Sequence, residues 1–532
     1  MESSSGSNDM DQQRKIQNTF EGIDYISHLP EAIILYILSF LPIKDLIVVS
    51  LLSRLWKNMV MNHLSIVPSS LNLDELEMIR NFIRRSIQRH QSADFLGASS
   101  SSQCLTNLIH SARRQYMDFV NRTLFLHSGC IINHLQLSFC YDGSDRYTRR
   151  VTSWVRFALT NKIKELDLDF SKGELLRPSD SAQPYELPNG SFCPNILHTL
   201  TLTYCKLKAA SFGVLISLQK LCLRQVKVIE GSIGELVSKC PVLEDVSLEH
   251  CVIPNEFMVS EEDIKIKRLS LIDCKTEEWP MFSIDISTPD LLMLTIVGRY
   301  LMTSSIRKAF RLREVFIDIE QIYADHVQGD ALGSLLDGFG HCKTLTLTTW
   351  CIQVLPTGEN LLQKLPIPLE NLEHLKLVAG MVKQELPGIA CLLRSCPNLK
   401  ILTLIMQDPV HVDWAEFEED IPDILDFEEH SYWELQNLPF RCLQTSLKQV
   451  KINGFTGKSN EVLTIKFLLE NAVVLENMEV FYAATNMFAA TIAEQQLINT
   501  LWFQDNSHYL QTFSRASPRV QIAVFRNLNF NM

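Results

Sequence analysis

The sequence predicts an α/β architecture: a small all-helical N-terminal module, then a solenoid with parallel strands on its concave face and helices and turns on its convex face. Three observations predict it. Apolar residues follow helical spacing near residue 33. A unit of two apolar residues separated by one residue recurs thirteen times between Leu135 and Val480. Nine-residue copies of that unit also align without gaps, which is the signature of a repeat array.

Composition and charge exclude several classes of protein. The 532 residues are too many for one hydrophobic core, so repeats or several domains are expected. The net charge of −12 argues against nucleic-acid binding, which needs an excess of Lys and Arg. The sequence contains neither a secretory signal nor an apolar run of membrane-spanning length. We therefore expect no membrane partner, reduced cysteines and a cytoplasmic or nuclear location.

The N-terminal module follows a polar tail at 1–22 that we expect to be disordered, and it occupies 23–65. Leu29-Pro30-Glu31 is typical of a helix start, and Leu41-Pro42 is expected to end that helix. Between them Ile33, Ile34, Ile37, Leu38 and Leu41 form one broad apolar stripe. A second short helix begins at Lys44-Asp45 and carries Leu46, Val49 and Leu52, and Trp56 closes the module. So few residues cannot bury this much apolar surface alone, so another surface must cover it.

A helical linker is predicted between the module and the repeats, at 66–123. Its clearest helix covers Leu73–Arg89, and a serine-rich loop is expected from Ser92 to Gln103.

Leucine-rich repeats are predicted over 124–406, because the thirteen apolar pairs recur at a suitable period. Successive pairs start 31, 34, 21, 25, 23, 25, 21, 30, 30, 27, 48 and 28 residues apart, and the usual period is about 20–29 residues. The pairs are Leu135/Leu137, Leu166/Leu168, Leu200/Leu202, Leu221/Leu223, Val246/Leu248, Leu269/Leu271, Leu294/Ile296, Val315/Ile317, Leu345/Leu347, Leu375/Leu377, Leu402/Leu404, Val450/Ile452 and Met478/Val480.

Two further details support the repeats. Cysteines stand five residues after the first apolar position in four of them, at Cys140, Cys205, Cys251 and Cys274. A small side chain there is expected to pack or hydrogen-bond where the chain turns off the strand. In addition, the nine residues from Cys240 align one for one with the nine from Cys396.

The widest gap between pairs holds an acidic insert at 407–440, which contains eleven acids and neither Lys nor Arg. The rest of the chain is almost neutral, since −12 + 11 = −1. The insert is either a binding segment for a basic substrate or a solvated loop, and we favour the loop. Its aromatic residues indicate that part of it packs on the repeats; they are Trp414, Phe417, Phe427, Tyr432 and Trp433.

Four segments of the N-terminal module resemble the F-box of plant F-box/leucine-rich-repeat proteins. They are Ile26-Ser-His-Leu-Pro-Glu31, Ile37-Leu-Ser-Phe-Leu-Pro-Ile-Lys44, Ser50-Leu-Leu-Ser53 and Trp56. The region 441–532 is similar to the FBD region of the same family, which predicts repeats and a cap there. The matching segments are Cys442-Leu-Gln-Thr-Ser-Leu-Lys448, Ile452-Asn-Gly-Phe455, Phe467-Leu-Leu-Glu-Asn-Ala472 and Leu475-Glu476.

The resemblance implies a non-catalytic substrate-recognition subunit of a Skp–cullin–F-box ubiquitin ligase. The F-box would bind a Skp-type adaptor, and through it a cullin, while the repeats bind a protein substrate. The adaptor-binding residues carried over by motif position are Leu29, Pro30, Ile33, Ile34, Ile37, Leu38, Leu41, Pro42, Leu46, Val49, Leu52 and Trp56. The chain departs from the family at Leu55, usually basic, and at Met59-Val60, where a second Trp often follows. Both departures lie at the end of the F-box and leave room for weaker adaptor binding.

The substrate face is predicted from the strand middles, because alternate side chains of a strand point to opposite faces. Its residues are Thr201, Ser247, Ser270, Thr295, Phe316, Thr346, Lys376 and Thr403, and the same position holds Cys222, Lys451 and Glu479 in other repeats. A solvated sheet surface is the alternative reading of these positions. Two other functions stay open: a repeat scaffold without a ligase, and a receptor with a small-molecule co-ligand.

Enzyme chemistry is not indicated. Gly454-Phe-Thr-Gly-Lys-Ser459 ends like a phosphate-binding loop, but Ile452 stands where that motif needs its first glycine. Histidines and cysteines lack metal-ligand spacing, so we expect neither a metal nor a cofactor.

Overall fold

The computed structural model describes most of the chain. The described residues are 26, 29–38, 40–41, 43–50, 52–62, 70–89, 101–127, 132–143, 145–171, 183–188, 196–209, 212–230, 232–254, 256–259, 265–277, 283–299, 304–320, 326–355, 364–407, 427–483 and 508–526. Contacts divide the chain into two compact units, described separately below. The first comprises Met1–Phe139 with Arg149–Leu166, and the second Cys140–Thr148 with Asp167–Met532. The predicted N-terminal tail lies outside the described residues.

Three short helices form the F-box module of the first unit: α2 (Glu31–Leu38), α3 (Ile43–Ser50) and α4 (Arg54–Asn62). Helix α2 ends at Leu38, earlier than predicted, because Leu41 N–H bonds to the Leu38 carbonyl at 3.0 Å in a tight turn. Trp56 lies in the first turn of α4, where its N–H donates to Ser53 Oγ at 3.3 Å. The sequence did not predict this third helix.

The remainder of the first unit contains helices α5 (Glu75–Arg89) and α6 (Ser101–Leu126), and most of α7 (Asp145–Thr160). The predicted linker is therefore helical, but it also contains a strand, β1 (Ser70–Asp74), that the sequence did not predict. β1 pairs in parallel with β2 (Ile132–Ser138), matching Leu71 to Leu135 and Leu73 to Leu137. The predicted serine-rich loop is shorter than expected at its far end, since Ser101–Gln103 begin α6.

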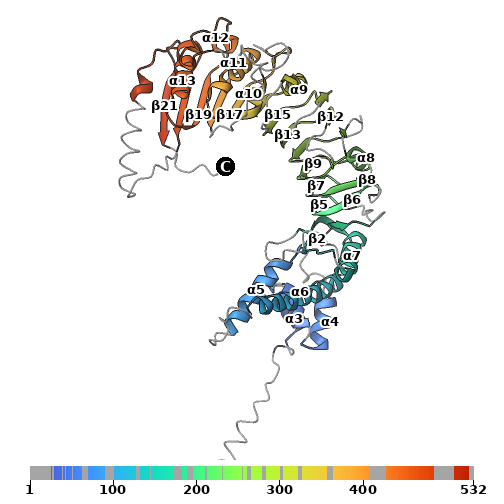
Figure 1. Cartoon of the computed structure of the whole chain (residues 1–532). Coiled ribbons are helices and arrows are strands. Elements are labelled where there is room, and N and C mark those ends of the chain that lie inside the picture. Colours follow the sequence, from blue (N-terminus) through green and yellow to red (C-terminus); the bar gives the residue numbers. More distant parts are fainter. Residues whose placement is uncertain are drawn as a thin grey trace, which may run out of the picture. The chain divides into compact units, whose positions relative to one another are not determined.

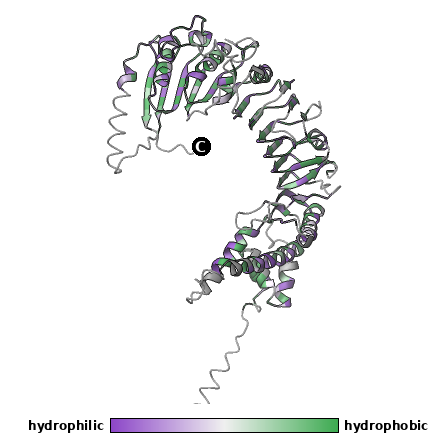
Figure 2. Ribbon diagram, viewed as in Figure 1, coloured by the Kyte–Doolittle hydropathy of each residue, from purple (hydrophilic) through white to green (hydrophobic). Residues whose placement is uncertain are grey.

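Twelve parallel strands of a fifteen-stranded sheet lie wholly in the second unit, side by side along a curve (Figure 1). The strands are β5 (Thr199–Thr203), β7 (Lys220–Arg224), β9 (Asp245–Glu249), β11 (Arg268–Ile272), β13 (Met293–Gly298), β15 (Glu314–Ile319), β16 (Thr344–Thr348), β17 (His374–Ala379), β18 (Ile401–Met406), β19 (Gln449–Phe455), β20 (Asn477–Tyr482) and β21 (Gln521–Arg526). With β2 and β3 (Ile163–Asp169), they contain all thirteen predicted apolar pairs, and every residue of those pairs is buried. The strands carry alternating hydrophobic and hydrophilic residues (Figure 2). The repeat prediction is confirmed, although the sequence missed β21.

The convex side of this sheet changes character along the chain (Figure 1). Up to β15 it carries two small three-stranded sheets and one short helix. These elements are β4 (Tyr185–Glu186), β6 (Cys205–Lys208), β8 (Lys227–Glu230), β10 (Glu256–Val259), β12 (Ser283–Ser287), β14 (Ser304–Arg307) and α8 (Ile233–Ser238). Beyond β15 it carries α9 (His326–Asp337), α10 (Thr349–Val354), α11 (Leu386–Ser395), α12 (Arg441–Thr445) and α13 (Ser459–Asn471). The prediction of helices and turns was therefore incomplete, because the shorter repeats use strands here.

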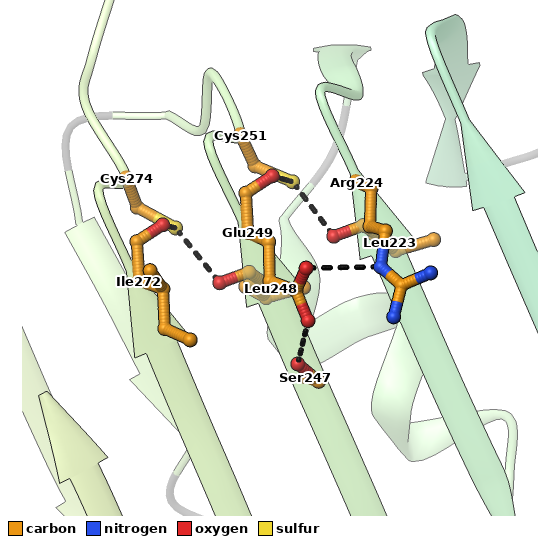
Figure 3. A network of polar contacts seen from close by, with 8 residues as sticks. All are labelled: Leu223, Arg224, Ser247, Leu248, Glu249, Cys251, Ile272 and Cys274. Carbon is orange, nitrogen blue, oxygen red and sulfur yellow. Dashed lines mark hydrogen bonds and ion pairs between the residues drawn. The ribbon is translucent and has the colours of Figure 1, made fainter. Parts of the chain in front are cut away.

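Cysteines hold the chain where it leaves the early strands. β5, β7, β9 and β11 are each followed by a residue with positive φ, such as His250 at 52° and Asp273 at 48°. After β5, β9 and β11 the next residue is a buried cysteine, and the Sγ atoms of Cys251 and Cys274 donate to the preceding strand (Figure 3). Cys251 reaches the Leu223 carbonyl at 3.3 Å, and Cys274 reaches that of Leu248 at 3.5 Å. The predicted role of these cysteines is confirmed.

Buried glutamates hold the same bend in two of the later repeats. Glu385 accepts from the N–H groups of Gly380 at 3.2 Å and Val382 at 3.0 Å. Glu461 accepts from the N–H groups of Thr456 at 2.7 Å and Gly457 at 2.9 Å. Both carboxylates therefore satisfy amides that the strand-to-helix turn leaves without backbone partners.

The second half of the acidic insert packs on the repeats. Trp433 stacks on Phe467 of α13 at 4.4 Å between ring centroids, and its Nε1 donates to Thr464 Oγ1 at 3.0 Å. Tyr432 is also buried and lies edge-on to Trp433. The predicted packing of the aromatic residues is thus confirmed for this half, while Trp414 and Phe417 lie outside the described residues.

Candidate functional site

The F-box module has a small core of its own. Ile34, Leu38, Leu46 and Trp56 are at most 9% exposed and form one apolar cluster. Six side chains pack around this cluster: Leu29, Leu35, Leu41, Val49, Met59 and Phe119. Phe119 belongs to α6, so the cluster is closed on one side by a helix of the same unit.

The twelve predicted adaptor-binding residues therefore divide into groups. Four form the core just described, and Leu29, Leu41 and Val49 are half-buried against it. The exposed members are Pro30, Ile33, Ile37 and Leu52. Pro42 lies outside the described residues. The buried members can support a binding surface only by shaping it, because an adaptor cannot reach a fully buried side chain.

A set of eight exposed apolar side chains belongs to the three helices and the residues next to them, and five of the eight are absent from the predicted adaptor-binding residues. We call it the module's apolar face, and it consists of Ile26, Ile33, Tyr36, Ile37, Phe40, Val48, Leu52 and Leu55. These eight make up more than a third of the 21 large apolar side chains that are exposed among the described residues. Phe40 and Leu52 are the most exposed, at 69% and 68%. Tyr36 and Phe40 also contact each other edge to face, at 4.8 Å.

Helix α2 explains why the sequence did not separate the two groups. Its apolar residues form two stripes rather than one: Ile34 and Leu38 face the core, whereas Ile33 and Ile37 face outward. Tyr36 and Phe40 follow Ile33 at i+3 and i+7, on the outward side of the helix. That spacing is the signal that would have identified them.

The predicted substrate residues come together in one row across the concave face. Strand pairing places Thr201, Cys222, Ser247, Ser270, Thr295, Phe316, Thr346, Lys376, Thr403, Lys451 and Glu479 next to one another in register. The register of the row is as predicted, but Cys222, Thr346 and Thr403 are buried within it. Its role in substrate binding stays a prediction.

The two ends of this row differ in how their charges are used. In the early repeats Arg224 Nε donates to Glu249 Oε2 at 2.9 Å, and Ser247 Oγ donates to Oε1 of the same carboxylate at 3.2 Å (Figure 3). Arg268 likewise pairs with Asp245 at 2.6 Å. In the later repeats Lys451 of the row pairs with Glu479 at 3.2 Å, whereas no ion pair joins Lys376 to a carboxylate of the described residues.

A cavity of about 380 Å³ lies outside both predicted surfaces, where the end of the acidic insert meets α12 and α13. The buried rings of Trp433, Phe440 and Phe467 form part of its wall. Lys466 and Glu470 of α13 add charged groups to the lining. No sequence pattern predicts this cavity.

Neither a cluster of metal ligands nor a membrane-spanning helix is found in the part of the chain that the structure describes. No three His, Cys, Asp or Glu side chains of that part gather as metal ligands would. None of its helices combines the length and the apolarity that crossing a membrane requires.

Comparison with known proteins covers both units. A family model described as the At1g61320/AtMIF1 LRR domain matches residues 123–498, and the F-box domain model matches residues 26–66. The chain is similar to three Arabidopsis thaliana proteins over most of their length. F-box/LRR-repeat protein At4g14096 is 27% identical over 89% of this chain and 91% of its own. An F-box/FBD/LRR-repeat protein, At4g03220, is 26% identical over 87% and 89%, and F-box/LRR-repeat protein At5g54820 is 23% identical over 86% and 91%.

Proposed function

This chain belongs to the F-box/LRR-repeat family, and on that premise we propose that it is the substrate receptor of a Skp–cullin–F-box ubiquitin ligase. The F-box module binds a Skp-type adaptor, which connects it to a cullin, and the repeats hold a protein substrate. The receptor itself catalyses nothing; it raises the concentration of the substrate near the ubiquitin-conjugating enzyme. We place this activity in the cytoplasm or nucleus.

The observation that carries the proposal is the module's apolar face. Single exposed apolar side chains are normal on the surface of a protein. Eight of them within a thirty-residue segment point to a protein interface. The module's core does not need these residues, because Ile34, Leu38, Leu46 and Trp56 already fill it. Aromatic residues such as Tyr36 and Phe40 are also the types that contribute most to binding energy at interfaces.

Leu55 and Met59 stand at two of the positions that depart from the family, and both place apolar side chains in the F-box module. Leu55 is 43% exposed and adds to the apolar face, and Met59 packs against the module's core. Both departures therefore keep the module apolar and packed. They do not argue for the alternative of a scaffold that has lost its adaptor.

The test is co-purification of the full chain with a Skp-type adaptor. The double variant Ile37→Glu, Leu52→Glu places two charges on the apolar face at side chains that are 42% and 68% exposed. We expect adaptor binding to fall at least about a hundredfold, since each buried charge costs a few kcal/mol. The melting temperature should stay within about 2 °C, because neither side chain belongs to the core.

Val214→Glu is the matched control, because Val214 is an exposed apolar residue (60%) of the second unit. It should leave adaptor binding unchanged. Undiminished adaptor binding by the double variant would refute the proposed interface. A wild-type chain that folds but never captures an adaptor would favour the scaffold alternative.

A further inference from the structure

Lys376 occupies the middle of the concave face without a carboxylate partner. It lies on β17 between Thr346 of β16 and Thr403 of β18 in the register of the sheet. Its side chain is half-buried, and no ion pair or hydrogen bond joins it to another described residue. A partly desolvated ammonium group gains most from an anion that arrives with a ligand.

The nearby carboxylates are already engaged. Glu373 receives Lys343 at 2.7 Å and Lys400 at 2.8 Å, and this double pairing lowers the pKa of its carboxyl to about 2. Glu479 pairs with Lys451 at 3.2 Å. Neither acid is therefore available to neutralise Lys376.

The local charge is opposite in sign to that of the whole chain. Strands β16 to β19, each taken with the residue before it, contain five lysines and one glutamate. The lysines are Lys343, Lys376, Lys400, Lys448 and Lys451. Glu476 and Glu479 pair with Lys448 and Lys451, so with these two acids the net charge of the stretch is 5 − 3 = +2. A positive stretch in a chain whose total charge is −12 favours an acidic ligand over a basic one.

Neutral hydrogen-bonding groups surround the ammonium. His374 Nε2 hydrogen-bonds with Thr403 Oγ1 at 2.8 Å. Burial, then the charges of Lys376 and Lys451, lower the pKa of His374 to about 4. The ring is therefore neutral at pH 7 and adds no competing charge. Thr403 is buried and holds the half-buried histidine ring in place beside Lys376.

An apolar border lies two residues farther along the same strands. Val378 and Ile405 are register partners on β17 and β18. Phe481 and Phe525, also register partners, stack at 4.8 Å on β20 and β21. A ligand that reaches from Lys376 to this border needs an acidic group and an adjacent apolar group. An extended peptide with an acidic residue next to an apolar one has both.

We propose that the concave face over β16–β19 binds an extended acidic segment of the protein substrate, with Lys376 as the ion partner of one carboxylate. Val378 and Ile405 then contact an apolar side chain next to that carboxylate. This inference rests on the proposed function for its statement that the segment belongs to a substrate. The early repeats do not offer the same site, because Arg224 and Arg268 are already paired with Glu249 and Asp245.

The test is selection of random twelve-residue displayed peptides on the immobilised full-length chain. We expect the enriched peptides to be acidic, with an apolar residue one or two positions from a Glu or Asp. The most enriched peptide, synthesised with a fluorophore, should lose about tenfold in affinity to Lys376→Gln, the effect of removing one charge-assisted contact. Replacing its acids by Gln should cause a similar loss with the wild-type chain.

Lys343→Gln is the matched control, since Lys343 lies on the same sheet but is paired with Glu373. Its effect on peptide affinity should stay within about twofold. Enriched peptides that are neutral or basic, or an acidic peptide that binds Lys376→Gln as well as wild type, would overturn the inference. Adaptor co-purification of the same preparation reports separately on the proposed function.

Discussion

The repeats before and after residue 320 build the same concave sheet over different convex layers. From β5 to β15 the apolar pairs start 21–25 residues apart and the convex layer consists mainly of strands. We call these the short repeats. From β16 to β20 the starts are 27–48 residues apart and the layer consists of helices, and we call these the long repeats. Chain length decides between them, because a strand advances about 3.3 Å per residue and a helix only about 1.5 Å, so a strand spans the convex side with fewer residues.

The two kinds of repeat also hold their first bend with different chemistry. In two short repeats a thiol donates to a carbonyl of the neighbouring strand, as Cys251 does to Leu223 and Cys274 to Leu248. In two long repeats a carboxylate accepts two backbone N–H groups of its own turn, as Glu461 does from Thr456 and Gly457. A thiol is a weak donor, so losing its hydrogen bond costs little free energy. Leaving a buried carboxylate, or the amides that it accepts from, without partners costs much more. The long repeats should therefore be more sensitive to substitution than the short ones.

The largest expected effect tests how closely the helices of the long repeats approach. A Cβ on Gly388 of α11 would lie 1.8 Å from the Ile352 carbonyl oxygen of α10. Gly388→Ala should therefore destabilise the long repeats by about 3 kcal/mol or more, because backbone must move to admit it. Hydrogen exchange of α10 and α11, combined with chemical denaturation, measures the loss.

Gly333→Ala is the control for this prediction. Gly333 lies in α9, and a Cβ there has no atom within 4 Å. Helix propensity alone should then stabilise the variant by about 0.5–1 kcal/mol. Equal stability of the Gly388 and Gly333 variants would show that the close approach of α10 and α11 is unimportant.

The second prediction concerns the carboxylate of the long repeats. Glu461→Ala removes the acceptor of two amides and of the Thr456 hydroxyl, which lies at 2.6 Å. We expect a loss of about 2–3 kcal/mol in the free energy of unfolding, with α13 exchanging its amides faster. Glu470→Ala, an exposed position of the same helix, should change stability by less than about 0.5 kcal/mol. Comparable effects of the two substitutions would contradict the role given to Glu461.

The smallest effect is expected in the short repeats. The neighbouring Cys274 thiol and burial raise the pKa of Cys251, so its thiol stays protonated at neutral pH and can donate. Cys251→Ala removes this weak hydrogen bond and some packing, and we expect a loss of about 1–2 kcal/mol by denaturation. Cys251→Ser keeps a donor and separates the two contributions. A loss larger than that of Glu461→Ala would reverse the ranking of the two kinds of repeat.

The sequence predicted the concave sheet well because its pattern is two-sided. Each strand buries two apolar residues and presents a middle residue to the concave face, so the thirteen pairs and the row from Thr201 to Glu479 could be read directly. The convex strands could not, because segments such as Lys227–Glu230 are too short to show a period. The sequence does not distinguish β1 because α5 follows it at once, so the predicted helix begins at Leu73, which is the fourth residue of β1.

The F-box was harder to resolve residue by residue. Its helices are apolar on more than one side, so composition alone does not tell the core from the interface. Ile33 and Ile34 are neighbours of the same type, yet one is 46% exposed and the other 0%. Only packing against Phe119 of α6 and within the module decides between them.

The junction between β18 and β19 has a consequence for engineering. Their strands pair residue for residue, Leu402 with Val450 and Leu404 with Ile452, although 48 residues separate the two starts. Closing a longer connection costs only about 0.6 kcal/mol for each doubling of its length. A foreign domain grafted into the acidic insert, ahead of Phe427, should therefore leave the stacking of the strands unchanged. A fluorescent reporter could thus be carried by the receptor without altering either of its binding surfaces.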